Sequence, residues 1–159
     1  MGRDSRGVKG IELRDDDFVI GMDVIEDESL QQVVTVSANG YGKRTPVPEW
    51  RLQNRGGIGI IAMDTSERNG ALVRLRLVSP DDQLMVITDA GQVIRTRVAE
   101  IRETGRNTQG VRVIRLADGE KVVDVEPVAE QEDEGAASPE GQEPGASGPS
   151  EPPVGDAGA

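Results

Sequence analysis

Residues 105–116 read Gly-Arg-Asn-Thr-Gln-Gly-Val-Arg-Val-Ile-Arg-Leu, and residues 2–13 read Gly-Arg-Asp-Ser-Arg-Gly-Val-Lys-Gly-Ile-Glu-Leu. A looser copy, Asn-Arg-Gly-Gly-Ile-Gly-Ile-Ile, spans residues 54–61. The copies are 50 and 53 residues apart at a shared glycine, found at Gly7, Gly57 and Gly110. Repeats of about this length are typical of proteins in which each unit buries its apolar face against a neighbouring unit. The chain is therefore predicted to consist of repeated units.

A second pair of similar segments supports the repeat. Residues 34–45, Val-Thr-Val-Ser-Ala-Asn-Gly-Tyr-Gly-Lys-Arg-Thr, parallel residues 85–96, Met-Val-Ile-Thr-Asp-Ala-Gly-Gln-Val-Ile-Arg-Thr, at an offset of 51. Strands are predicted in the middle copy at residues 58–63, 71–78, 83–88 and 92–98. Turn sequences that tolerate a positive φ separate such runs, namely Asn39-Gly40, Asn69-Gly70 and Asp89-Ala90-Gly91.

Four antiparallel strands in each unit of about 50 residues predict the blades of an all-β propeller or pinwheel. Residues 1–128 contain 28 Val plus Ile against 8 Leu, a balance that favours pleated sheet. A closed ring takes about 4 to 8 blades, and this chain has about two and a half. We therefore expect a partial ring that starts inside a repeat, with the missing blades upstream of Met1.

Charge is distributed unevenly along the chain. The formal net charge is −11, but residues 129–159 carry 8 Asp plus Glu and no Lys or Arg. Residues 1–128 therefore hold 18 basic and 21 acidic residues, a net charge of −3. The C-terminal segment is rich in Pro, Gly, Ser and Ala, and it is predicted to be a disordered acidic tail because it cannot bury enough apolar surface.

Several classes of function are excluded or disfavoured by composition. The chain has no Cys and no His, which removes disulfides, thiolate nucleophiles, imidazole bases and the usual zinc or copper sites. No apolar run approaches the roughly 20 residues that a membrane span needs. We expect a cytoplasmic protein with no cofactor, no metal site and no catalytic residues of its own.

Arginines recur at regular positions. In residues 92–98 the two-residue period of a strand places Arg95 and Arg97 on the face opposite Ile94 and Val98. The same alternation places Arg74 and Arg76 on one face of the preceding run. One explanation is that exposed charges protect sheet edges from aggregation.

Recurrence favours a second explanation, a basic rim that binds a long polyanion. Arg44 and Arg95 are equivalent in successive repeats, as are Arg3 and Arg106. The only aromatic residues are Phe18, Tyr41 and Trp50, too few to stack successive unpaired bases, so the phosphates of duplex DNA are the expected target.

Three other patterns do not indicate chemistry. Residues 42–45 lack the spacing of a phosphate-binding loop. Tyr41 could be a DNA-cleaving nucleophile, but its glycine neighbours favour a hairpin tyrosine. The run Asp15-Asp16-Asp17 lacks the alternation of a calcium loop, which favours a solvated connection.

Three motifs together resemble the C-terminal domain of the A subunit of DNA gyrase: residues 41–46 (Tyr-Gly-Lys-Arg-Thr-Pro), 51–57 (Arg-Leu-Gln-Asn-Arg-Gly-Gly) and 105–111 (Gly-Arg-Asn-Thr-Gln-Gly-Val). The resemblance covers residues 2 to about 128. It implies a six-bladed β-pinwheel whose basic rim wraps duplex DNA for an ATP-dependent type II topoisomerase that introduces negative supercoils. It also implies partnership with the rest of the gyrase A polypeptide and with gyrase B in an A2B2 complex at the bacterial nucleoid, where ATP and Mg²⁺ serve the parent complex only.

The wrapping box of this family is present in altered form. Its Gln-Arg-Arg-Gly-Gly-basic-Gly pattern is matched here by Gln53, Arg55, Gly56, Gly57 and Gly59. Asn54 and Ile58 replace two basic residues, so the segment is interpreted as a degenerate copy with the intact box upstream. Its glycines could let backbone N–H groups approach a phosphate, or they could simply form a sharp turn between blades.

The predicted DNA contacts are ten basic residues: Arg3, Arg6, Lys43, Arg44, Arg51, Arg55, Arg95, Arg97, Arg102 and Arg106. Two alternatives from the same fold remain open at this point, the matching domain of topoisomerase IV and a propeller-type scaffold for protein interactions. An independent enzyme is a third and weaker alternative, because no nucleophile, base and oxyanion donors can be assembled from these residues.

Overall fold

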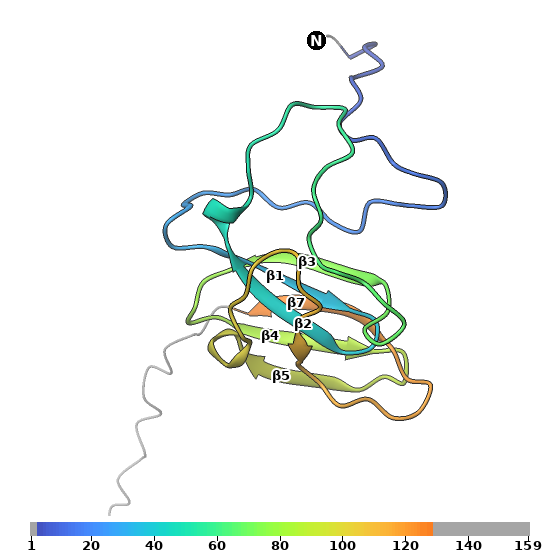
Figure 1. Cartoon of the computed structure of the whole chain (residues 1–159), viewed down its shortest axis with the longest axis vertical. Helices are drawn as coiled ribbons and strands as arrows, with labels where there is room; N and C mark the ends of the chain where they lie inside the picture. Colours follow the sequence, from blue (N-terminus) through green and yellow to red (C-terminus); the bar gives the residue numbers. More distant parts are fainter. Residues whose placement is uncertain (1–2, 129–159) are drawn as a thin grey trace, which may run out of the picture.

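The computed structural model describes residues 3–128, which form two antiparallel sheets (Figure 1). The first sheet has the strand order β3-β1-β2-β6, and the second has the order β5-β4-β7. The first comprises β1 (Gln32–Ser37), β2 (Tyr41–Pro46), β3 (Leu72–Val78) and β6 (Val111–Arg112). The second comprises β4 (Gln83–Thr88), β5 (Val93–Arg97) and β7 (Val122–Val128). Short 3-10 turns, η1 (Val47–Glu49) and η2 (Val98–Glu100), follow β2 and β5. The all-β prediction is confirmed.

The two sheets are built on the same plan. The β1–β2 hairpin pairs Val34 with Arg44, and the β4–β5 hairpin pairs Met85 with Arg95, 51 residues later at both positions. A third strand then returns to the far side of each hairpin, β3 beside β1 and β7 beside β4. Each of these pairings shifts register at one place, after Val36 in the first sheet and after Ile87 in the second. One local sequence pattern therefore gives one local structure twice.

The predicted turns are confirmed by their backbone geometry. Gly40, Gly70 and Gly91 have φ angles of 77°, 74° and 80°. These angles lie in the left-handed region, where a side chain would be strained, so glycine is favoured at the tips of the β1–β2 and β4–β5 hairpins and in the turn before β3.

The core lies between the two sheets, which stack as layers in Figure 1. Its members are mostly β-branched, as the composition predicts, and they come from both sheets. The fully buried side chains of the cluster include Val34, Val36 and Val78 from the first sheet and Leu84, Val86, Val122 and Val125 from the second. Burying each such side chain contributes about 1.5–3 kcal/mol, which makes this interface the main stabilising feature.

One predicted strand is wrong. Residues 58–63 contain no strand, and Ile58 and Ile61 are each 59% exposed. An apolar run forms a strand only where another strand supplies hydrogen bonds, and no described strand pairs with residues 58–63. The fourth strand of the first sheet is instead β6, which the following unit contributes to the free edge of β2.

Residues 3–31 and 51–61 form a projection beyond the two sheets (Figure 1). Two backbone hydrogen bonds join its parts, from Gly56 N to Gly10 O at 2.8 Å and from Glu12 N to Gly57 O at 2.9 Å. Large apolar side chains are exposed on it, including Phe18, Met22 and Leu52 at 76%, 84% and 100%. The predicted acidic tail, residues 129–159, lies outside the described residues.

Candidate nucleic-acid interface

The outer face of β5 carries two exposed arginines. Burial alternates along the strand, with Arg95 and Arg97 exposed and Ile94 and Thr96 partly buried. β5 is the edge strand of its sheet, and neither arginine side chain has a hydrogen bond or ion pair with another described residue. Two free guanidiniums on one edge can each contact a phosphate, as the sequence predicts.

Arg44 holds the equivalent place in the first sheet but in a different environment. Its Nε donates to Ile101 O at 2.7 Å, and its Nη1 donates to Gln32 Oε1 at 3.0 Å. Its backbone N–H donates to Arg102 O at 3.2 Å. The segment after η2 therefore covers β2 at Arg44, whereas the equivalent position on β5 is exposed. Part of the Arg44 guanidinium is therefore already hydrogen-bonded within the protein.

Lys43 requires a correction. Its side chain is fully buried, and its ammonium donates to Gly105 O at 2.7 Å, to Arg106 O, and to Thr108 Oγ1 at 3.3 Å. Burial lowers its pKa to about 8. The amine therefore holds the loop at residues 105–108 and does not face a phosphate.

In this copy of the Gly-Arg-x-Ser/Thr motif, residues 105–108 form a loop that closes over Lys43 of the preceding unit. At the place equivalent to Lys43 in the second unit stands Ile94, which packs against the apolar core. The lysine belongs to the motif and not to the basic rim.

Arg106 is also structural. Its Nε donates to Glu49 O at 2.8 Å, its Nη1 donates to Ile61 O at 3.0 Å, and its guanidinium lies 5.9 Å from the centre of the Trp50 ring. These contacts hold the 51–61 segment against η1. Arg3, its equivalent in the first copy, is exposed and without such partners among the described residues.

The degenerate wrapping box lies on the projection. Arg51 and Arg55 are exposed, and residues 51–57 line an open surface hollow of about 670 Å³. Gly56 and Gly59 have φ angles of 75° and 79°, whereas Gly57 does not adopt the left-handed conformation. Gln53 is exposed beside them. The geometry is compatible with the turn and with a phosphate approach alike.

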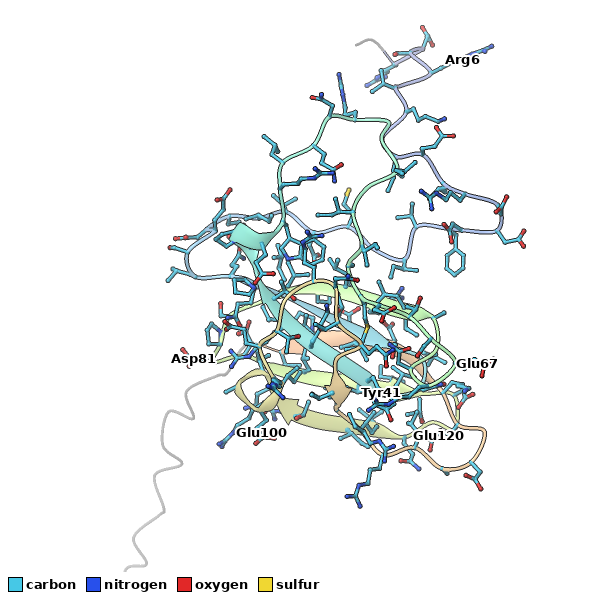
Figure 2. The ribbon with its side chains drawn as sticks, in the orientation of Figure 1. Arg6, Tyr41, Glu67, Asp81, Glu100 and Glu120 are labelled. Atoms are coloured by element: carbon cyan, nitrogen blue, oxygen red, sulfur yellow. The ribbon has the colours of Figure 1, made fainter. Side chains whose placement is uncertain are left out.

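The remaining predicted residues lie in separate places. Arg102 is exposed just after η2, on the body of the molecule. Arg6 lies at the far end of the projection from Tyr41, as Figure 2 shows. The ten predicted residues therefore divide into a group on the body and a group on the projection.

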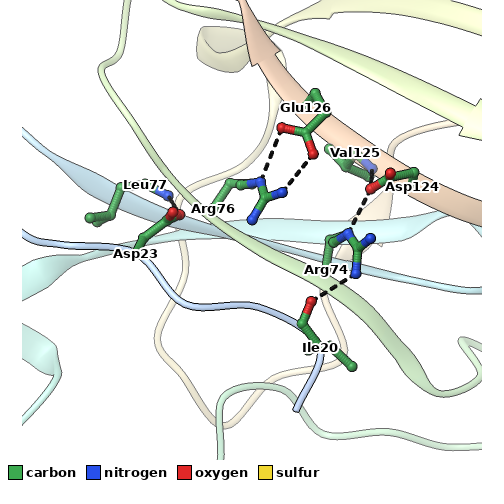
Figure 3. Close-up of polar contacts among 8 residues, drawn as sticks. All are labelled: Ile20, Asp23, Arg74, Arg76, Leu77, Asp124, Val125 and Glu126. Carbon is green, nitrogen blue, oxygen red and sulfur yellow. Dashed lines mark hydrogen bonds and ion pairs between the residues drawn. The ribbon is translucent and has the colours of Figure 1, made fainter. Parts of the chain in front are cut away.

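Arg74 and Arg76 do not form a free basic face. They are partly buried between the sheets, where Arg74 Nε lies 2.6 Å from Asp124 Oδ1 and Arg76 Nη2 lies 2.5 Å from Glu126 Oε1 (Figure 3). Arg74 Nη1 also donates to Ile20 O at 2.7 Å, which attaches the N-terminal segment to β3. Arg74 and Arg76 share one face of β3, as predicted, but Asp124 and Glu126 on β7 neutralise their charges.

A cluster around Tyr41 was missed by the sequence analysis. Arg112 Nη2 donates to the Tyr41 hydroxyl at 3.0 Å, and the guanidiniums of Arg68 and Arg112 lie 4.7 Å and 5.5 Å from the ring centre. Arg68, Arg112 and Arg115 all line one cavity of about 420 Å³ beside Tyr41, which is open to solvent. Arg112 and Arg115 stand in the repeated 105–116 segment and could have been noticed there, whereas Arg68 comes from a loop with no pattern.

Within residues 3–128 the structure has no helix long and apolar enough to cross a membrane. The same residues bring no three metal-ligating side chains together.

The family model for the DNA gyrase C-terminal domain, described as a β-propeller, matches residues 1–26, 31–79 and 82–129. The chain belongs to this family. Two of the matches coincide with the structural units, since residues 31–79 hold β1 to β3 and residues 82–129 hold β4 to β7. The resemblance seen in the motifs is thereby confirmed.

Individual relatives support the same family assignment. The DNA gyrase A protein of Staphylococcus epidermidis is 50% identical over 133 residues, and that of a Staphylococcus aureus strain is 49% identical over 134 residues. Each match covers 84% of this chain and 15% of the relative, so the chain spans about 15% of the length of these proteins.

Solved structures show the same fold. A DNA gyrase A C-terminal domain matches 63% of this chain and 34% of its own with a TM-score of 0.59 and 26% identity. The C-terminal domain of a DNA topoisomerase IV matches 77% of this chain and 38% of its own with a TM-score of 0.70 and 20% identity, which supports the fold alone.

Proposed function

We propose that residues 1–128 bind duplex DNA without sequence preference, as C-terminal blades of a gyrase A-type protein. The observation that carries this proposal is the edge of β5, where Arg95 and Arg97 are exposed and have no acidic partner among residues 3–128. Arg102 extends this group past η2. Guanidiniums that contact only phosphates give affinity but carry no sequence information.

The parent complex is inferred from the relatives. A chain of this family would serve a type II topoisomerase that hydrolyses ATP and introduces negative supercoils, together with the rest of gyrase A and with gyrase B in an A2B2 assembly. The blades themselves would contain no catalytic residue and no cofactor site, and ATP and Mg²⁺ would act elsewhere in the complex. The working compartment would be the bacterial cytoplasm, at the nucleoid.

Residues 129–159 carry 8 carboxylates and no Lys or Arg. In this proposal they act as an acidic tail whose carboxylates compete with DNA phosphates for the arginines of residues 1–128, and so moderate binding. A purely solubilising role is the alternative.

Binding of fluorescent duplexes tests the proposal. Fluorescence anisotropy is measured with two duplexes of equal length and unrelated sequence at low salt, and equal affinities are expected. The double variant Arg95→Ala, Arg97→Ala should bind both duplexes more weakly, by the same factor. Arg14 is an exposed arginine outside the predicted set, so the control variant Arg14→Ala should bind them nearly as well as the wild type. Lack of binding, or a strong preference for one sequence, would contradict the proposal.

The exposed apolar side chains of the projection favour a second candidate, a scaffold for protein interactions. Apolar contacts respond weakly to salt, whereas phosphate contacts weaken steeply, so the salt response of binding separates the two.

A further inference from the structure

The cluster at Tyr41 has the geometry of a built site. Tyr41 is 6% exposed, so its ring is held in place at the start of β2. Arg112 lies directly opposite on β6 and donates to the phenol oxygen, while Arg68 approaches the ring from the loop before β3. The ring thus orients two guanidiniums that come from different parts of the chain.

Close backbone packing fixes the position of Arg112. A Cβ atom at Gly110 would lie 2.6 Å from Gly42 O, and one at Gly42 would lie 2.8 Å from Val113 Cγ2. Only glycines allow β6 to approach β2 this closely. Arg112 is therefore held by the sheet, while its side chain remains exposed toward the cavity.

Positive charge is concentrated here without compensation. Arg68, Arg112 and Arg115 all line the cavity of about 420 Å³ and are exposed. None forms an ion pair with a carboxylate of residues 3–128, in contrast to Arg74 and Arg76. Like charges held together repel one another, and an anion between them removes that repulsion.

We infer that this cavity holds one phosphate group of the duplex backbone, bound jointly by Arg68 and Arg112 with Arg115 at its rim. Arginine suits this ligand because its planar fork presents two donors to two phosphate oxygens. The inference rests on the proposed function, since it assigns a fixed point on the DNA path. It differs from the β5 edge, where Arg95 and Arg97 contact phosphates independently of each other.

A double-mutant cycle in the full chain tests the joint site. Arg68→Gln and Arg112→Gln should each weaken duplex binding about tenfold at low salt, as loss of a charged hydrogen bond does. The double variant should lose about the same, well short of the hundredfold product, because both residues hold one phosphate. The matched control pair, Arg95→Gln and Arg97→Gln, should combine multiplicatively.

A second readout does not depend on DNA. Tyr41 is the only tyrosine of the chain, so its phenol ionisation can be followed by absorbance. Hydrogen bonds from Arg68 and Arg112 lower the pKa of this phenol. Inorganic phosphate in the cavity should raise that pKa relative to chloride at equal ionic strength, and the Arg68→Gln, Arg112→Gln double variant should not respond.

The outcomes separate the two proposals. Multiplicative losses at Arg68 and Arg112, unchanged DNA affinity in these variants, or a phenol that ignores phosphate would overturn the inference and leave the DNA-binding function standing. Absence of DNA binding by the wild-type chain would overturn both. If the effects of the substitutions disappear when the chain ends at Val128, the cavity binds the acidic tail instead, and the inference is wrong.

Discussion

Arg76 and Glu126 hold equivalent places in successive units and bind each other. Arg76 is opposite Val34 in the β3–β1 pairing, and Glu126 is opposite Met85 in the β7–β4 pairing. Met85 is the equivalent of Val34, 51 residues later in the chain. Arg74 and Asp124 repeat the relationship one step along the same strands (Figure 3). If the two units were identical in sequence, like charges would face each other here. Because one unit carries arginines and the next carries acids at these positions, the two faces attract each other.

Exchange of the charges tests this complementarity. Arg76→Glu alone should lower the free energy of unfolding by about 1 kcal/mol, because it places a carboxylate beside Glu126 in a partly exposed site. Adding Glu126→Arg should restore most of the loss. Urea unfolding measures both variants, and Arg95→Glu is the control on an exposed position. A double variant no more stable than Arg76→Glu would show that the pair does not contribute.

Lys43 predicts an alkaline rise in stability. Its native pKa is about 8 against an ordinary 10.5, so between these values the unfolded chain binds more protons and the free energy of unfolding rises with pH. The rise attributable to Lys43 is at most about 3 kcal/mol. Below about pH 8 the contribution of Lys43 to the free energy of unfolding does not change with pH.

Lys43→Met should flatten this rise, and at pH 7 it should cost about 2 kcal/mol, since the carbonyls of Gly105 and Arg106 lose their donor. Tyr41, whose pKa is also lowered, contributes a rise that the substitution leaves in place. Urea unfolding between pH 7 and 10.5 gives the difference between wild type and variant. Parallel curves would contradict the lowered pKa of Lys43.

The projection predicts marginal stability or self-association of the isolated chain. Phe18, Met22 and Leu52 expose apolar side chains that a neighbouring blade would cover. Sedimentation should detect association that increases with concentration, and Phe18→Ser with Leu52→Ser should reduce it. A monomer that melts cooperatively at high temperature would show that no further blade is needed.

Local patterns predicted most of the fold, and tertiary contacts decided the rest. The strands β3, β4 and β5 and the turns at Gly40, Gly70 and Gly91 follow from side-chain alternation and turn chemistry, which act over a few residues. Residues 58–63 are an apolar run that was also predicted to be a strand, but they lack a partner strand among the described residues. That difference depends on residues far away in the sequence.

The site shows the same division. Arg95 and Arg97 were predicted to be exposed, and they are, because the edge position leaves the outer face of β5 open. Lys43 was misplaced because its acceptors lie 62 and 63 residues away, on a loop that the sequence alone does not bring near. Arg68 was missed for the same reason, since only the folded chain places it over Tyr41.

Deletion tests the acidic tail. A chain that ends at Val128 should bind duplex DNA more tightly at low salt, because 8 competing carboxylates are removed. The gain should shrink as salt screens the tail. Anisotropy titrations with and without residues 129–159 measure it, and a tail of scrambled sequence with the same charge should restore the weaker binding. Equal affinities at low salt would leave only a solubilising role.

The salt dependence of duplex binding tests the central claim most directly. The logarithm of the binding constant of the wild-type chain should fall steeply and linearly with the logarithm of salt concentration, since each arginine displaces about one counterion. In the Arg95→Ala, Arg97→Ala variant the slope should be smaller by up to about 2, with equal loss of affinity on unrelated sequences. An unchanged slope in a folded variant would remove the β5 edge from the interface, and a wild-type affinity that does not respond to salt would contradict phosphate binding altogether.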